Sequence, residues 1–125
     1  IFNAVFGDNT PFPFNGNVPN KNIISNLPQG ACVEVPVLAS QHGIDAFQVG
    51  AMPDQLALLN NISCRCEELA LAGALSGDPR PVFQAILFDP LTSAVLGISE
   101  IRDMVNRMFA ANRKYLSNFK SLKVR

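Results

Sequence analysis

The sequence lacks the features that draw a protein to nucleic acid or to a membrane. Its 125 residues include ten basic and ten acidic side chains, which leave no net charge to attract a phosphate backbone or anionic lipid. It contains no run of about eighteen apolar residues that would span a bilayer. The first residues, Ile1 to Ala4, lack the basic start of a secretion signal. We therefore expect a cytoplasmic protein with no nucleic-acid or membrane partner.

The common signatures of catalysis are missing as well. The sequence has no glycine-rich phosphate loop, no nucleophile elbow and no metal-binding histidine pair. Its three cysteines are an odd number and do not form a disulfide framework, which agrees with a reducing compartment. The chain starts at Ile1 without an initiator Met, as a piece of a longer protein or a processed chain would.

The composition fits one compact domain of the α+β class. A chain of 125 residues that is 48% hydrophobic can enclose a core of its own. Residues 1–30 are rich in Asn, Pro and Gly, which predicts mostly irregular, extended chain. Within this part, Phe12–Val18 can form a brief strand if it lies at the edge of a sheet.

A β-hairpin is predicted after this irregular segment. Apolar and polar residues alternate over Ala31–Leu38, which is typical of a half-buried strand. The buried face of this strand holds Val33, Val35 and Val37. The turn falls at Gln41–Gly43, and Ile44–Val49 returns as the second strand.

Three helices follow, so that the predicted fold is a small antiparallel sheet or hairpin with three packed helices. The first begins at Pro53 and ends at Gly77, the second begins at Asp78-Pro79 and ends at Asp89-Pro90, and the third begins with Ser99 as its cap. Their apolar faces are, in order, Leu56, Leu59, Ile62, Cys66 and Leu69; Val82, Phe83, Ile86 and Leu87; and Ile101, Val105, Met108, Phe109, Leu116 and Phe119.

The cysteines and the single histidine are the first candidates for metal binding or catalysis. Cys64 and Cys66 are two residues apart, about 200° around a helix, so their side chains cannot readily share one ion. We interpret one as packed and the other as near the surface. Cys32 lies in the predicted strand, where we expect packing of a small side chain. His42 falls in the hairpin turn, where we expect exposure to solvent.

Glu34, Glu67 and Glu68 are carboxylates that could serve either as catalytic acids or in structural roles. Glu67 and Glu68 are neighbours on a helix and splay by roughly 100°, so a solvated face is the better interpretation. Glu34 is a lone carboxylate between valines. It needs a hydrogen-bonding partner if both faces of the sheet are covered, as a structural acid rather than a catalytic one.

Asparagines are the best candidates for contact with a polyhydroxylated ligand. An amide offers donors and an acceptor and stays neutral at every working pH. The five that cluster here are Asn15, Asn17, Asn20, Asn22 and Asn26. The same residue type also forms turns, and from the residues alone turn formation is the preferred interpretation.

Several short phrases occur in an order typical of one enzyme family. Along the chain they are Asn17-Val18-Pro19-Asn20, Asn26-Leu27-Pro28, Gly30, Val33-Glu34-Val35-Pro36, Gly43-Ile44, Val49-Gly50, Pro53, Glu68-Leu69, Gly77-Asp78, Asp89-Pro90-Leu91-Thr92, Glu100-Ile101 and Tyr115-Leu116. On these phrases, the stretch from Asn17 to Phe119 resembles the C-terminal part of family 4 glycoside hydrolases, on the α-galactosidase and α-glucosidase side.

The resemblance implies a two-part enzyme. An NAD-binding Rossmann-type domain would be followed by an α+β domain like that of lactate and malate dehydrogenases, and residues 1–125 would form most of this second, substrate and oligomerisation domain. NAD and a divalent metal such as Mn²⁺ are the implied cofactors, and a glycoside is the implied substrate of a homo-oligomer. The implied reaction is oxidation at C3 of the sugar, elimination of the aglycone, addition of water and reduction at C3, an exception to two-carboxylate hydrolysis.

The resemblance assigns the reactive groups to sequence upstream of Asn17. The family's metal-ligating cysteine and histidine, tyrosine base and NAD loop are therefore not mapped onto Cys32, Cys64, His42 or Tyr115. We expect no catalytic, metal-binding or cofactor-binding residue in this chain. The loop from Asn17 to Asn20 is the segment placed nearest the sugar, with both asparagines as substrate-binding residues.

Two departures from the family pattern leave alternatives open. Asn22 stands where a glycine is usual, and Ala72-Gly73 replaces a Glu-Ala pair. Glycine inside a helix costs about 1 kcal/mol relative to alanine, so either a close helix contact exists at Gly73 or the chain is a degenerate homologue. The competing interpretation is a non-catalytic binding or oligomerisation module that uses the apolar helix stripes as its interface.

Overall fold

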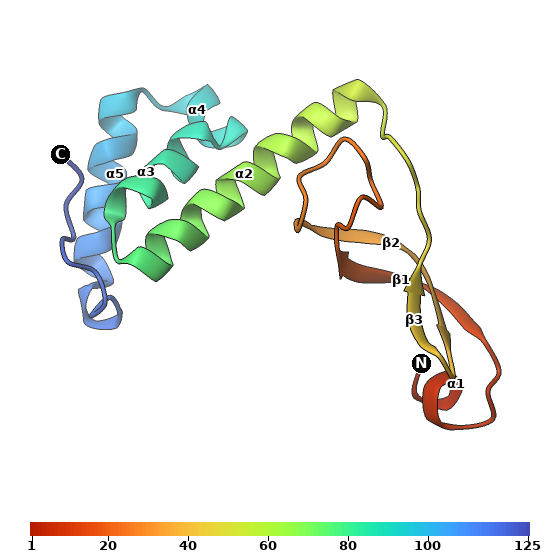
Figure 1. The fold of residues 1–125 in the computed structure, drawn as a ribbon. Helices are drawn as coiled ribbons and strands as arrows, with labels where there is room; N and C mark the ends of the chain where they lie inside the picture. Colours follow the sequence, from red (N-terminus) through yellow and green to blue (C-terminus); the bar gives the residue numbers. More distant parts are fainter. The chain divides into compact units, whose positions relative to one another are not determined.

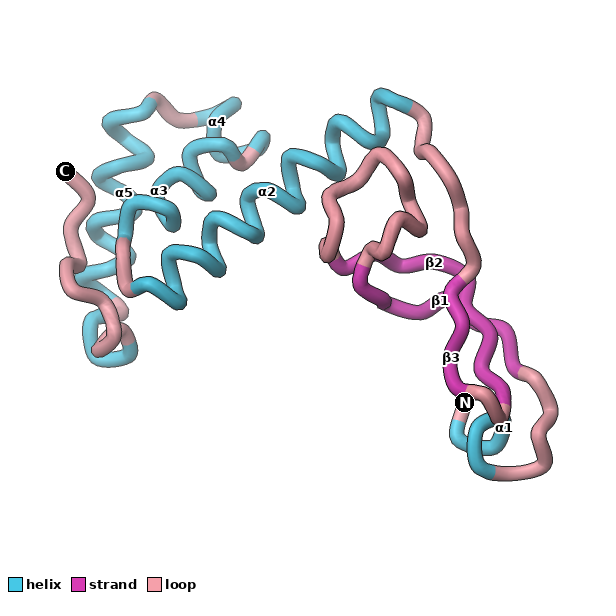
Figure 2. The backbone as a smooth tube through the Cα atoms, in the orientation of Figure 1, coloured by secondary structure: helices cyan, strands magenta, loops and turns pink.

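The computed structural model describes all 125 residues, which divide into two compact units. Unit 1 is Ile1–Leu58 and contains the sheet, whereas unit 2 is Leu59–Arg125 and is helical (Figures 1 and 2). Each unit has its own cluster of buried hydrophobic side chains. The predicted α+β class is confirmed, although the single core that we expected is replaced by two.

The sheet has three antiparallel strands in the order β1-β2-β3. A short helix, α1 (Phe2–Phe6), comes before β1 (Phe12–Pro19), which pairs with β2 (Cys32–Ser40). The predicted edge strand is confirmed, and its edge position explains why it tolerates prolines that cannot donate to a ladder. β3 (Gly43–Ala46) completes the predicted hairpin.

The second strand of the hairpin is shorter than the sequence predicts, whereas β2 continues to Ser40, past its predicted end at Leu38. Gly43 has a φ of 113°, a backbone conformation that suits glycine in the turn. β3 ends at Ala46 rather than at Val49, because the Val49 N–H donates to the carbonyl oxygen of Ile23 at 2.9 Å instead of continuing the ladder. The end of the predicted strand therefore pairs with the loop that precedes β2.

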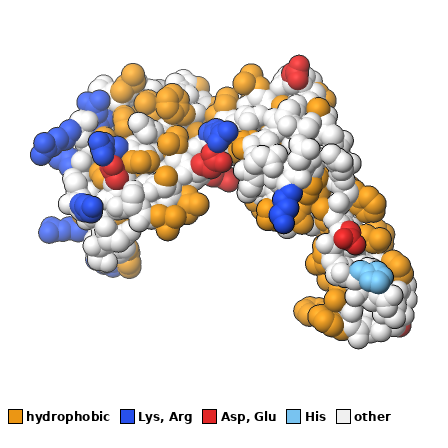
Figure 3. Space-filling view, in the orientation of Figure 1, with side chains coloured by type: hydrophobic (Ala, Val, Ile, Leu, Met, Phe, Trp, Pro, Cys, Tyr) orange, Lys and Arg blue, Asp and Glu red, His pale blue; other side chains and the backbone are white.

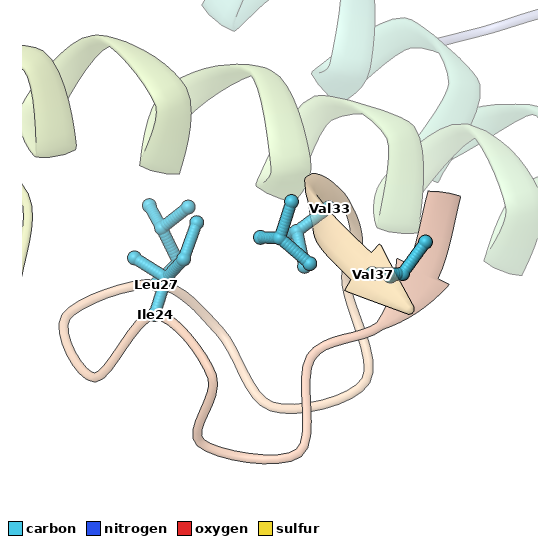
Figure 4. Close-up of a cluster of buried hydrophobic side chains, with 5 residues drawn as sticks. Ile24, Leu27, Val33 and Val37 are labelled. Atoms are coloured by element: carbon cyan, nitrogen blue, oxygen red, sulfur yellow. The ribbon is translucent and has the colours of Figure 1, made fainter. Parts of the chain in front are cut away.

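The core of unit 1 lies on one face of β2. Val33, Val35 and Val37 are buried, as the alternation predicts, while the residues between them are exposed. Ile24 and Leu27 from the loop before β2 complete this cluster (Figure 4). Successive side chains of a strand point to opposite faces of the sheet. The face opposite the three valines therefore remains exposed to solvent, and we call it the open face.

The helices of unit 2 enclose the second core. α2 (Asp54–Ser76) continues from unit 1 and ends before Gly77, whose φ of 67° confirms the predicted stop. It is followed by α3 (Pro79–Phe88), α4 (Pro90–Val95), α5 (Ile98–Ala111) and a 3₁₀ turn at Arg113–Tyr115. The core consists of Phe83, Ile101, Val105, Phe109 and Val124.

Helix starts follow the aspartate caps more closely than we predicted. Asp78 caps α3 as expected, because its carboxylate accepts the N–H of Arg80 at 2.9 Å. Asp89 ends α3 as predicted but also caps α4, a helix that the sequence analysis missed. Its carboxylate accepts the N–H of Thr92 at 2.8 Å.

The predicted limits of α5 are wrong at both ends. Its cap is Gly97 rather than Ser99, and the Glu100 carboxylate accepts the N–H of Gly97 at 2.7 Å. The helix ends at Ala111, so Leu116 and Phe119 lie beyond it, although both still pack against the core of unit 2.

The predicted buried face of α2 is only partly covered. Leu56 and Leu59 of that face are 45% and 57% exposed, and its other members, Ile62, Cys66 and Leu69, are half-buried. The buried positions of α2 are small residues, Ala57 and Gly73. A Cβ on Gly73 would lie 2.6 Å from Cγ2 of Val82, so close helix contact explains this glycine. None of the helices has the length and apolar character that crossing a membrane requires.

Candidate functional site

Asn20 is the centre of the loop that joins β1 to β2. Its side-chain Nδ2 donates to the carbonyl oxygens of Ile24, Leu27 and Pro28 at 2.9 to 3.1 Å. Its Oδ1 accepts the N–H groups of Ile23 and Ile24 at 2.9 and 3.0 Å. Asn20 is only 1% exposed, so every polar atom of its side chain serves the loop itself.

This geometry changes the role that we assigned to Asn20. A side chain that is buried and satisfied by five internal hydrogen bonds has no donor or acceptor left for a sugar hydroxyl. The main chain of Asn20 closes the loop as well, because Gly30 N–H donates to its carbonyl oxygen at 2.9 Å. Asn20 therefore shapes the loop and can act on a ligand only through the backbone that it positions.

Two further asparagines hold the same loop. Asn22 has a φ of 62°, in the left-handed region that asparagine tolerates better than most residues. The backbone thus keeps a conformation suited to the family's usual glycine. Asn26 forms a two-way hydrogen bond with Met52: its Nδ2 donates to the carbonyl oxygen at 2.8 Å and its Oδ1 accepts the N–H at 2.9 Å.

The polar residues that remain accessible lie on the open face of the sheet. Asn15 and Asn17 are exposed on β1, and Glu34 and Cys32 are exposed on β2. Asn17 lies in β1, within the predicted strand Phe12–Val18, so the segment Asn17–Asn20 that we describe as a loop is the end of this strand followed by Asn20. Because the open face does not bury Glu34, this carboxylate does not need the internal partner that a two-sided sheet would demand.

The strand register brings Asn17 and Glu34 together. They are directly opposite each other in the antiparallel ladder, a placement that puts Cβ atoms roughly 5 Å apart. An amide beside a carboxylate offers one set of donors and several acceptors, which is the chemistry that binds vicinal hydroxyl groups. Sequence reasoning singled out both residues but could not pair them, because the pairing depends on where the loop returns.

The thiols and the histidine do not form a reactive centre. Cys32 is exposed, against our expectation that it packs, and His42 is exposed as predicted. Cys64 and Cys66 are both half-buried. Burial raises the pKa of both thiols, and the charges of Glu67 and Glu68 raise that of Cys64 further. Neutral thiols are poor nucleophiles and poor metal ligands.

The remaining candidates lie on solvated surfaces. Glu67 and Glu68 are exposed, and Glu68 pairs with Arg65 at 2.6 Å, so the predicted solvated helix face is confirmed. Tyr115 is 71% exposed. No three His, Cys, Asp or Glu side chains converge to hold a metal ion. The residues of this chain therefore do not fit a metal site of their own.

Comparison with known proteins gives consistent results. The sequence pattern of the family 4 glycosyl hydrolase C-terminal domain matches residues 1–92. The alpha-galactosidase of Bacillus subtilis (strain 168) is 38% identical over 112 residues, which are 90% of this chain and 26% of that protein. The alpha-galactosidase of Rhizobium meliloti (strain 1021) is 30% identical over 103 residues, which are 82% of this chain and 21% of that protein.

A solved structure shares the fold. A 6-phospho-alpha-glucosidase from gut microorganisms, in complex with NAD and Mn²⁺, superposes with a TM-score of 0.77 at 19% identity. It covers 87% of this chain, and this chain covers 24% of it. The chain belongs to glycosyl hydrolase family 4 and corresponds to its C-terminal domain. It spans about a quarter of the length of its relatives. The family match begins at residue 1 rather than at Asn17.

Proposed function

We propose that this chain is the sugar-site and assembly part of an NAD- and divalent-metal-dependent glycosidase of the α-galactosidase or α-glucosidase type. The observation that carries the proposal is the match to an alpha-galactosidase over 90% of the chain at 38% identity. The reaction would be oxidation at C3, elimination, addition of water and reduction at C3. Three unpaired thiols fit a reducing compartment, and a cytoplasmic location is part of the proposal.

We expect one part of the enzyme to hold NAD and the metal and this chain to bind the sugar. This chain has no cluster of metal-ligating side chains and no glycine-rich phosphate loop, so NAD and the metal would be held by an N-terminal domain. The chain's own contribution is to bind and orient the sugar. We place Asn17 at the sugar with Glu34 beside it, and Asn20 behind them as a positioning residue.

A chimera tests the activity directly. The matching C-terminal segment of the Bacillus subtilis alpha-galactosidase would be replaced by this chain. Nitrophenol release from nitrophenyl α-galactoside and α-glucoside would then be measured with and without NAD and Mn²⁺. We expect turnover that requires both cofactors, and none from the 125-residue chain alone. A chimera that folds and binds NAD but turns over neither glycoside would refute the proposal.

Substitution in the same chimera tests the site. Asn17→Ala should raise KM or lower kcat because it removes an amide from the sugar face. Gln84→Ala, an exposed amide on α3, is the matched control and should leave both constants unchanged. Kinetics of Asn17→Ala equal to those of the control would remove Asn17 from the site while leaving the assigned activity intact.

A second role, assembly into a homo-oligomer, is favoured by a specific observation. Leu58, Leu71 and Leu75 of α2 are 63%, 60% and 79% exposed, and exposed apolar side chains on one helix are typical of an interface. Light scattering after size exclusion should show a multimer, and Leu71→Gln with Leu75→Gln should shift it to smaller mass. A monomer at all concentrations would contradict this role.

A further inference from the structure

A basic hollow lies in unit 2 where the turn from α2 to α3 meets the C-terminal segment. It has a volume of about 530 Å³ and is open to solvent. Its charged lining consists of Asp78, Arg80, Lys120, Lys123 and Arg125. Figure 3 shows Lys and Arg side chains gathered over the part of unit 2 near the C-terminus. We call this feature the basic hollow.

The charge of the hollow contrasts with that of the whole chain. Four of the ten basic residues and one of the ten acidic residues line it, which gives 4 − 1 = +3 in a chain of zero net charge. Asp78 is already engaged, because Arg80 donates to its carboxylate at 2.6 to 3.0 Å. The hydrogen bond from Arg80 is the main cause that lowers the pKa of Asp78.

Lys120, Lys123 and Arg125 form no ion pair with an acidic side chain, although the charge of Lys120 helps to lower the pKa of Asp78. The chain has two ion pairs, Arg65–Glu68 and Arg80–Asp78, and neither includes Lys120, Lys123 or Arg125. Like charges held around one hollow repel each other and are stabilised by an anion that neutralises several of them together. The arrangement thus favours a multiply charged anion over a single monovalent one.

The backbone of these cations is fixed. Lys120 N–H donates to the carbonyl oxygen of Gly77 at 3.1 Å, and the Asn118 side chain donates to Ala74 at 2.7 Å. Further along, Val124 is buried and exchanges two hydrogen bonds with the Asn106 side chain, at 2.7 and 3.2 Å. Anchors on both sides of Lys123 reduce the backbone ordering that a ligand would have to impose.

We propose that the basic hollow binds a small anion that carries two phosphate groups. Lys and Arg are the residues that recognise phosphate oxygens, by point charge and by paired N–H donors respectively. The hydroxyl of Ser121, also in the lining, donates to the carbonyl oxygen of Lys123 at 3.2 Å and so helps to fix the backbone of that lysine. The volume lies within the range of small-molecule sites, roughly 300 to 1,000 Å³. All lining residues of the basic hollow belong to unit 2, whereas Asn17 and Glu34 belong to unit 1.

Calorimetric titration of the 125-residue chain with inorganic pyrophosphate tests the proposal. We expect saturable one-to-one binding that weakens as KCl is added, because salt screens exposed charges. Combined Lys120→Gln and Lys123→Gln should lower the affinity at least tenfold. The matched control, Arg113→Gln with Lys114→Gln, removes the same charge from exposed residues of unit 2 outside the hollow and should change the affinity less than twofold.

Titrations with other anions show which arrangement of phosphate groups the hollow prefers. Tighter binding of fructose 1,6-bisphosphate than of pyrophosphate would indicate separated phosphate groups, and the reverse order would indicate adjacent ones; either result supports the site. Sulfate should bind at least tenfold more weakly than pyrophosphate. Non-saturable binding, equal binding of sulfate, or an equal loss in the control variant would overturn the proposal. Lys120→Arg keeps the charge, so its affinity for pyrophosphate should stay close to that of the unchanged chain.

Discussion

The loop built around Asn20 makes a sharp prediction about stability. Asn20→Ala would remove the partner of two backbone N–H groups, those of Ile23 and Ile24, and of one carbonyl oxygen, that of Leu27. The carbonyl oxygens of Ile24 and Pro28 each keep a second donor at 3.3 Å, the N–H groups of Leu27 and Ala31. A buried polar group without a partner costs about 1–3 kcal/mol.

The expected cost follows from how many of these groups stay buried. Ile24 and Leu27 are buried residues, so two polar groups lose their partner away from solvent. Partial relaxation of the loop reduces the sum, and we expect Asn20→Ala to lower the free energy of unfolding by about 2–4 kcal/mol. That is a large share of the roughly 5–15 kcal/mol typical of a domain.

Urea unfolding followed by far-UV circular dichroism measures this cost, because the chain has no tryptophan to report by fluorescence. The matched control is Asn15→Ala, an exposed asparagine on β1, which should change the free energy of unfolding by less than about 0.5 kcal/mol. Asn20→Asp keeps the size but turns a donor into an acceptor that faces three carbonyl oxygens, so it should destabilise at least as much. A loss below about 1 kcal/mol for Asn20→Ala would refute the reasoning.

Three further predictions concern helix and loop positions. Gly73→Ala gains about 1 kcal/mol of helix propensity, but its Cβ would overlap Val82 at 2.6 Å. Overpacking should therefore lower the free energy of unfolding, measured in urea, by a net amount of about 1–2 kcal/mol. A more stable variant would contradict the close contact. Asn22→Gly should stay within about 0.5 kcal/mol of wild type and Asn22→Val should lose about 1–2 kcal/mol, whereas equal values would show that the positive φ is not required. Asp89 has a pKa lowered from 3.8 by the N–H of Thr92, so its stabilisation is present above pH 3.8 and is lost as the pH falls through the lower folded-state pKa. The pKa values of Asp8 and Asp78 are lowered as well, so Asp89→Asn should reduce, not abolish, the fall of the melting temperature between neutral and acid pH. An unchanged fall would locate the titration elsewhere.

Local patterns predicted the parts of the fold whose cause is local. The alternation of Val33, Val35 and Val37 depends only on the period of a strand, and it identified the buried face of β2. Gly77 ended α2 because a left-handed residue stops a helix wherever the helix packs. Asp78 capped α3 for a similarly local reason.

The errors arose where the outcome depends on residues distant in sequence. The apolar period of α2 is real, but a period does not say whether anything covers Leu56 or Leu59, and both are exposed. The sequence predicts Asp89-Pro90 only as a helix end, although the same dipeptide at Asp78-Pro79 is correctly predicted as a helix start. Asn20 was assigned to a ligand because its type suits sugars, and only the return of the loop showed that its amide is used internally.

The reciprocal hydrogen bonds between Asn26 and Met52 have a consequence for motion. The Asn26 side chain donates to and accepts from the backbone of Met52, as two paired strand residues do. These hydrogen bonds link positions 26 residues apart in sequence. The tip of the loop and the entry to α2 must then open together, since neither can leave without stranding the other's polar groups. Amide hydrogen exchange at Met52 should therefore report on the opening of the loop around Asn26 as well as on the opening of its own segment.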